Sequence, residues 1–166
     1  MDVVNASIVS LDVDAIVNAA NKSLLGGGGV DGVIHRTAGP LLRQECETLG
    51  GCDTGDAKIT KGYNLHANWV IHAVGPIWRG GASDEAALLA RCYRRSLEIA
   101  LAHHVESIAF PAISTGAYSY PKAEAARIAI NEVYSFTMQN RGPARIVFAC
   151  MGGSDTRLYQ RVLRER

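Results

Sequence analysis

The strongest fold signal in the chain is Asn18–Gly32, which reads Asn-Ala-Ala-Asn-Lys-Ser-Leu-Leu-Gly-Gly-Gly-Gly-Val-Asp-Gly. Two amides, Asn18 and Asn21, stand at the end of an apolar segment, and four glycines precede a lone carboxylate at Asp31. Glycine lets the backbone approach a ligand closely and adopt positive φ without a Cβ penalty. Placed just before a helix, such a loop offers free N–H groups to an anion. The stretch therefore predicts a strand, a phosphate-binding loop and a helix in succession.

Apolar segments alternate with helical patterns along the rest of the chain. We expect strands at residues 3–9, 14–18, 57–60, 69–75, 107–113 and 145–151. Several of these segments are apolar on both faces, which is typical of strands covered by helices on both sides. The alternation predicts an α/β fold, a three-layer α/β/α arrangement with a mixed, largely parallel central sheet. Residues 1–166 are expected to form a single domain of this kind.

Four helices are expected between these strands. The first starts near Asp31 and continues through Leu41 on apolar positions at helical spacing. Ser83 is expected to cap the second helix, Pro121 to occupy the first position of the third, and Ser154 to cap the fourth. In sheets of this class, ligands bind at the carboxyl ends of the strands.

The composition is that of a globular protein, with 48% hydrophobic and 20% charged residues. A net charge of +1 offers no large basic field, so no nucleic-acid partner is expected, and the arginines near the C-terminus are interpreted as a solvated helix face. No signal-peptide pattern and no apolar run of membrane-spanning length is present, so we expect a cytoplasmic protein with no membrane partner. The cysteines show no ligand spacing, so free thiols, no metal and no cofactor are expected.

A second motif spans Phe110–Pro121 and reads Phe-Pro-Ala-Ile-Ser-Thr-Gly-Ala-Tyr-Ser-Tyr-Pro. After a strand, Ser114, Thr115 and Gly116 offer backbone N–H and hydroxyl donors near another helix N-terminus. Two donor loops that face each other suit a diphosphate. A P-loop would need a Lys-Ser/Thr pair after its glycines, but Gly26–Gly32 contains no Lys and no following hydroxyl residue. The match of Gly27–Gly32 to Gly-x-Gly-x-x-Gly is weak because a glycine tetrad satisfies many patterns.

Together with Gly55–Ala57 and Val70–Pro76, these motifs resemble the macrodomain family, in its MacroD-type branch. The resemblance implies binding of ADP-ribose and hydrolysis of O-acetyl-ADP-ribose and of mono-ADP-ribosyl esters on acidic side chains, with ADP-ribosylated proteins as partners. It implies that Asn21 orients the distal ribose and that Asp31 is the catalytic carboxylate. It also implies diphosphate contacts at Gly29, Val30, Ser114, Thr115, Gly116, Ala117 and Tyr118.

The adenine end departs from the family pattern. The family usually has Gly-Asp-Ile where this chain has Ala6-Ser7-Ile8, and its Asp accepts a hydrogen bond from the adenine amino group. Ser7 is neutral and shorter, so the charge-assisted contact is missing, while Ile8 can still lie against the base. Met151 stands where the family often has an aromatic residue. Weakened adenine selectivity is therefore expected, unless Asp155 supplies the missing acceptor.

The chemistry of ester hydrolysis assigns roles to two of these side chains. A desolvated carboxylate such as Asp31 can align a water molecule and accept its proton. The Asn21 amide can both donate and accept, and so can fix ribose hydroxyls without adding charge. The commoner role of an acid at a helix start is to interact with the helix dipole, but such an acid would repel a bound phosphate. Asn18, His35 and His72 are interpreted as supporting or structural side chains.

Two other functions remain open at this point. A non-catalytic reader of ADP-ribose with weakened adenine selectivity would use the same loops for binding alone. A role in binding RNA or a partner protein receives no support from the near-zero net charge.

Overall fold

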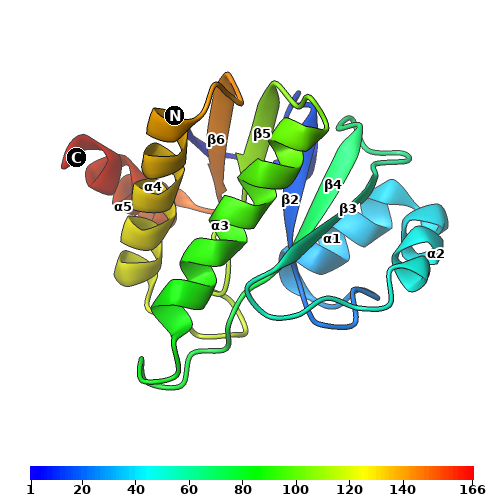
Figure 1. Ribbon diagram of the computed structural model, residues 1–166, viewed down its shortest axis with the longest axis horizontal. Helices are drawn as coiled ribbons and strands as arrows, with labels where there is room; N and C mark the ends of the chain where they lie inside the picture. Colours follow the sequence, from blue (N-terminus) through cyan, green and yellow to red (C-terminus); the bar gives the residue numbers. More distant parts are fainter.

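A mixed six-stranded sheet lies at the centre of the structure, a computed structural model that describes residues 1–166 (Figure 1). The strands are β1 (Asp2–Asn5), β2 (Ala15–Ala20), β3 (Ala57–Lys61), β4 (Trp69–Val74), β5 (Ser107–Phe110) and β6 (Arg145–Cys150). The helices are α1 (Gly29–Ala38), α2 (Pro40–Thr48), α3 (Glu85–Ala102), α4 (Lys122–Gln139), α5 (Gly153–Arg164) and a short 3-10 helix, η1 (Ile8–Ser10).

The strand order is β1-β6-β5-β2-β4-β3, and every neighbouring pair is parallel except β3 and β4. This confirms the mixed, largely parallel sheet expected from the sequence. The carboxyl ends of five strands meet at one edge, because these strands run in the same direction. The glycine loop after β2 and the Ser-Thr-Gly loop after β5 therefore lie at the same edge.

Helices cover both faces of the sheet and confirm the three-layer arrangement (Figure 1). On one face, α3, α4 and α5 pack onto a core that includes Val17 and Ile71; on the other, α1 and α2 pack onto a core that includes Ile16 and Val70. Consecutive residues of one strand thus enter opposite cores, as the pleat of a strand requires. No helix in the structure combines the length and the apolar character that crossing a membrane would take.

The first expected strand and the fifth both end earlier in the structure. The segment 3–9 is a strand only to Asn5, after which residues 8–10 turn into η1. The segment 107–113 ends as a strand at Phe110, since Pro111 has no N–H to extend a ladder. In each case the residues that follow the shortened strand leave the sheet at the edge where the glycine loop and the Ser-Thr-Gly loop lie.

The first expected helix is in fact two helices. Gly39, at φ 88°, ends α1, and α2 starts at Pro40 in a new direction. Leu41 is consequently 52% exposed, and its expected place on a buried stripe is wrong. Proline suits the first turn of a helix because its missing N–H needs no partner there.

The expected helix starts are each wrong by one or two positions. Asp84, at φ 62°, precedes α3 where Ser83 was expected, and Gly152 precedes α5 where Ser154 was expected. Pro121 stands just outside α4. The backbone N–H of Ser83 instead donates to the carboxylate of Glu85, which holds Ser83 in the preceding turn.

Candidate functional site

The turn after β2 is organised by the side chain of Asn21. Its Nδ2 donates to the carbonyl of Gly26 at 3.0 Å. Its Oδ1 accepts from the backbone N–H and hydroxyl of Ser23 and from the N–H of Leu24, at 2.6–3.2 Å. An asparagine that bonds backbone groups a few residues ahead is a common turn former. Asn21 thus fixes the path by which the chain enters the glycine loop.

Asp31 lies in the first turn of α1 and is only 4% exposed. Its Oδ1 accepts a hydrogen bond from Asn18 Nδ2 at 2.8 Å, and His35 Nε2 lies 3.3 Å from the same oxygen. Burial raises the pKa of Asp31 above its ordinary value, against the lowering effects of the Asn18 hydrogen bond and of His35. A carboxylate with a raised pKa is a stronger base than a solvated one.

Gly27 separates the polar atoms of the two expected site residues. A Cβ placed on Gly27 would lie 3.1 Å from Asp31 Oδ2 and 3.5 Å from Asn21 Nδ2. The side chains of Asp31 and Asn21 therefore both reach the space in front of Gly27, which has no side chain to fill it. A Cβ on Gly32 would lie 2.7 Å from the carbonyl oxygen of Gly27, so α1 also packs directly against the loop.

Both loops present backbone N–H groups that donate to no other group of the protein. In the glycine loop and the first turn of α1 these belong to Gly29, Val30 and Asp31; in the second loop they belong to Gly116, Ala117 and Tyr118. N–H groups in the first turn of a helix have no partner within that helix and so remain available to an anion. The structure thus keeps free donors on both sides of the expected diphosphate position.

In the second loop, Ser114 and Thr115 differ in what their hydroxyls can do. The Thr115 hydroxyl donates to the carbonyl of Ala112 at 2.9 Å. Ser114, at φ 68°, has a buried hydroxyl with no partner, and it lies against Gly75, the residue directly after β4. A buried hydroxyl without a partner is costly, and Ser114 is the residue of this loop that bears this cost.

A cavity of about 340 Å³ lies between the turn after β2 and the second loop. Its walls come from the turn after β2, from the segment that precedes β3, from the end of β4 with the segment that follows it, and from the second loop: Asn21, Lys22, Ser23, Thr54, Val74, Gly75, Ile77 and Tyr118. This volume is within the range of small-molecule sites. Lys22, Thr54 and Ile77 were not expected here from the sequence, since no motif marks them.

At the expected adenine end, Ile8 and Met151 are placed very differently. The side chain of Ile8 is 3% exposed and packs into the core beneath α1, so a ligand would meet chiefly its backbone. Met151 is 66% exposed. The backbone carbonyl of Ser7 accepts from the N–H and hydroxyl of Ser10, while the Ser7 hydroxyl has no bond to another residue.

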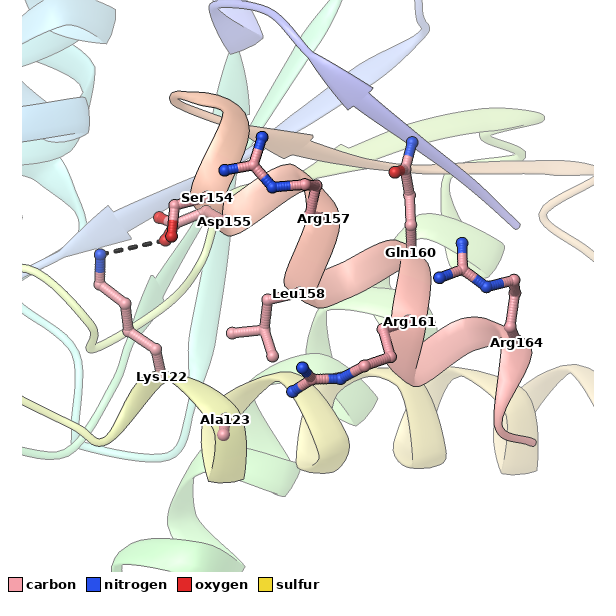
Figure 2. Close-up of a pocket in the computed structure, with 9 residues that line it drawn as sticks. All are labelled: Lys122, Ala123, Ser154, Asp155, Arg157, Leu158, Gln160, Arg161 and Arg164. Atoms are coloured by element: carbon pink, nitrogen blue, oxygen red, sulfur yellow. Dashed lines mark hydrogen bonds and ion pairs between the residues drawn. The ribbon is translucent and has the colours of Figure 1, made fainter.

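A larger cavity, of about 630 Å³, lies between α4 and α5 (Figure 2). Arg157, Arg161 and Arg164 of α5 line it, and none of the glycine-loop or second-loop residues does. Asp155 is the one acid in its lining, and its carboxylate lies 3.0 Å from Lys122 Nζ. The proposed substitute acceptor for adenine is therefore already paired with a lysine.

His35, Cys46 and His72 place one possible metal-ligating atom each within 4.8 Å of one another. His72 Nδ1 lies 3.1 Å from the amide nitrogen of Asn18, and His72 Nε2 lies 3.7 Å from Cys46 Sγ. Burial, together with Glu45, raises the pKa of the Cys46 thiol to about 11. The three side chains pack together beside Asp31, where His35 Nε2 lies 3.3 Å from Oδ1 of that carboxylate.

Glu85, in the first turn of α3, clamps the loop after β4. Its carboxylate accepts from the backbone N–H groups of Arg79, Gly81 and Ser83 at 2.6–2.9 Å. Burial raises the pKa of Glu85, but these hydrogen bonds outweigh it and bring the value down to about 2. Trp78, in the same loop, packs on Tyr120 with ring centroids 4.8 Å apart.

Comparison with known proteins agrees with this arrangement. The family model described as "Macro domain" matches residues 17–129. A Citrobacter rodentium protein named O-acetyl-ADP-ribose deacetylase is 53% identical over 168 residues, which covers 99% of this chain and 95% of that protein.

Two solved structures are also similar. The Oceanobacillus iheyensis macrodomain with ADP has a TM-score of 0.94 and 40% identity over 98% of this chain and 89% of its own. The Trypanosoma brucei macrodomain in complex with ADP-ribose has a TM-score of 0.90 and 44% identity over 96% of this chain and 67% of its own. This chain belongs to the macro domain family.

Proposed function

We propose that residues 1–166 form one macro domain that binds ADP-ribose and hydrolyses O-acetyl-ADP-ribose and mono-ADP-ribosyl esters on acidic side chains. The observation that carries the proposal is the approach of Asp31 Oδ2 and Asn21 Nδ2 to the same point in front of Gly27, in a glycine loop with free N–H groups. The name of the Citrobacter rodentium relative supports a hydrolase, and the ligand of the Trypanosoma brucei structure supports ADP-ribose.

In this proposal the diphosphate lies between the free N–H groups of the two loops. Gly29 and Val30 bond it from one side, and Ser114, Thr115, Gly116, Ala117 and Tyr118 surround it from the other. An anion at a helix N-terminus is stabilised by oriented backbone dipoles as well as by hydrogen bonds. Binding there would direct the distal ribose toward Asn21 and the cavity beyond it.

Asp31 then acts as the general base. A water molecule gives a proton to Asp31 Oδ2 as its oxygen bonds to the carbonyl carbon of the ester. The bond between that carbon and the ribose oxygen breaks, and the ribose oxygen takes a proton back. The products are ADP-ribose and a carboxylic acid. The raised pKa of Asp31 and the hydrogen bond that fixes its Oδ1 suit this role.

The test combines calorimetry with ADP-ribose and a turnover assay on O-acetyl-ADP-ribose. Asp31→Ala should lose a factor of about 10²–10⁴ in turnover, the usual contribution of a general base. Its affinity for ADP-ribose should be preserved or increased, because a negative charge close to the phosphates is removed. If Asp31→Ala hydrolyses the ester at the wild-type rate, Asp31 only interacts with the helix dipole and the catalytic proposal fails.

A non-catalytic reader is the second candidate, and one observation favours it. Asn21 Oδ1 already accepts three hydrogen bonds within its own turn, so in this state the side chain organises the loop. The reader predicts tight ADP-ribose binding with no turnover by the wild-type protein. The wild-type assay alone therefore separates the two candidates.

A further inference from the structure

A row of buried polar side chains extends from Asp31 across three neighbouring strands. Asn18 on β2 donates to Asp31 Oδ1 at 2.8 Å and lies 3.1 Å from Nδ1 of His72, its cross-strand partner on β4. His72 Nε2 lies 2.9 Å from the hydroxyl of Thr60 on β3. Asn18, His72 and Thr60 are at most 1% exposed. A buried polar row of this kind is costly unless its hydrogen bonds are made, so its geometry is strongly constrained.

One arrangement of protons satisfies the row while Asp31 is ionised. The amide nitrogen of Asn18 has two hydrogens and can only donate, so it serves Asp31 Oδ1 with one and His72 Nδ1 with the other. His72 must then bear its proton on Nε2, where it donates to Thr60. With the amide reversed, Asn18 Oδ1 would face a carboxylate oxygen at 2.8 Å with no hydrogen between them. Burial, with a smaller contribution from His35, lowers the pKa of His72 to about 3, so the ring stays neutral.

The oxygen of Asn18 is buried and has no partner. The orientation of this amide therefore rests entirely on the two acceptors of its nitrogen, Asp31 and His72. Without an acceptor at the His72 position, nothing but Asp31 itself would hold the amide in place.

We propose that His72 is a positioning residue for Asp31, acting through Asn18. By accepting the second amide hydrogen of Asn18, His72 keeps the first directed at Asp31 Oδ1. This leaves Asp31 Oδ2 as the oxygen that faces Gly27 and Asn21, where the water would be activated. The kinetic part of this inference rests on the proposed function, whereas the hydrogen-bond arrangement does not.

Two substitutions at His72 separate positioning from simple filling of the core. Asparagine can place its side-chain oxygen where Nδ1 now lies and so can accept from Asn18. Glutamine carries its amide one bond farther out, level with Nε2, and so retains the bond to Thr60 instead. His72→Gln should lower kcat for O-acetyl-ADP-ribose about tenfold to hundredfold, with KM within about twofold, since a misplaced catalytic group costs rate. His72→Asn should restore kcat to within about threefold of the wild type.

Equal losses of kcat in both variants, or a lowered melting temperature in His72→Gln with kcat unchanged, would overturn the proposal. Asn18→Ala combined with His72→Gln should be little worse than Asn18→Ala alone, because both act through one hydrogen bond. Fully additive losses would contradict the linkage.

Nuclear magnetic resonance tests the arrangement without turnover. In the wild type, His72 should be the tautomer protonated on Nε2, and a proton on Nδ1 would overturn the proposal. In His72→Gln the pKa of Asp31 should rise, because the Asn18 hydrogen bond that lowers it is weakened. An unchanged Asp31 titration would refute positioning. If the wild type fails to hydrolyse the ester, the proposed function fails, and these two resonance measurements still decide the inference.

Discussion

Gly75 and Ser114 are in such close contact that a methyl group on Gly75 would overlap the Ser114 hydroxyl and lie 2.6 Å from Ile113 Cγ2. Gly75 directly follows β4, and Ser114 begins the second donor loop after β5. The absence of a side chain at position 75 therefore sets how closely the second loop can approach the cavity beside Asn21.

Gly75→Ala should consequently push the second loop outward. Overpacking of this kind typically costs about 1–3 kcal/mol of stability, and the displaced N–H groups should bind ADP-ribose more weakly. Thermal unfolding and calorimetry would measure the two effects. Gly116→Ala is the matched control for stability, because its Cβ would meet no atom within 4 Å. Equal stability of the two variants would refute the close contact.

Asn21→Ala should weaken both binding and turnover. Each lost neutral hydrogen bond is worth roughly 0.5–1.5 kcal/mol, and the turn that precedes the glycine loop loses its organising side chain at the same time. Calorimetry and the turnover assay would report the ligand effects, and thermal unfolding the structural one. Asn140→Ala, which removes a hydrogen bond from a side-chain amide to the Phe136 carbonyl at the end of α4, is a control for stability alone. Lower stability with unchanged affinity would show that Asn21 serves the fold and not the ribose.

Ser7 should leave the adenine amino group without a charged acceptor, so inosine diphosphate ribose should compete almost as well as ADP-ribose. Ser7→Asp should tighten ADP-ribose selectively by about 1.5–3 kcal/mol, the worth of a hydrogen bond to a charged group, since inosine has no amino group to donate. Competition calorimetry measures both. A wild-type protein that strongly prefers ADP-ribose would contradict this prediction and point to Asp155. Asp155→Asn would then abolish the preference, at the cost of the pairing with Lys122.

Glu85 should make stability depend on pH in acid. Its folded pKa of about 2 lies below its ordinary value of 4.5, so its stabilising effect is complete above pH 4.5 and is lost as the pH falls toward 2. Glu85→Gln should lower the melting temperature at pH 7 and flatten its dependence on pH between 4.5 and 2. Glu47→Gln, which changes an exposed carboxylate, is the control. A melting temperature in Glu85→Gln that still falls as steeply as the wild type would rule out the clamp.

The sheet and the layers could be predicted because they depend on patterns that repeat. Segments such as 69–75 are apolar on both faces, and strand alternates with helix throughout. The ends of helices and strands depend on single contacts, which the spacing of apolar residues along the sequence does not reveal. Ser83 resembles a helix cap in the sequence, yet in the structure its backbone N–H donates a hydrogen bond to the carboxylate of Glu85. The Gly39-Pro40 pair was a readable signal for a helix break and was missed.

The candidate site divides in the same way. Asn21 and Asp31 could be singled out because both lie in one short motif, and the structure brings their side chains together. The roles of both remain predictions. The row through His72 and Thr60 could not be predicted, because it requires the pairing of β2 with β4 and of β4 with β3. Strand order and register join residues that are far apart in sequence, such as Asn18 and His72, and a single sequence does not state them.

The two donor loops rest on different cores. Ile34 and Val30 of α1 pack into the core on one face of the sheet, while Ile113 and Tyr120 beside the second loop pack into the core on the other. Packed regions of this kind can open separately, each with its own free energy of local unfolding. A ligand that bonds both loops at once binds only when both regions are closed. Its binding should therefore slow amide hydrogen exchange in α1 and in α4 together, including amides that never touch it.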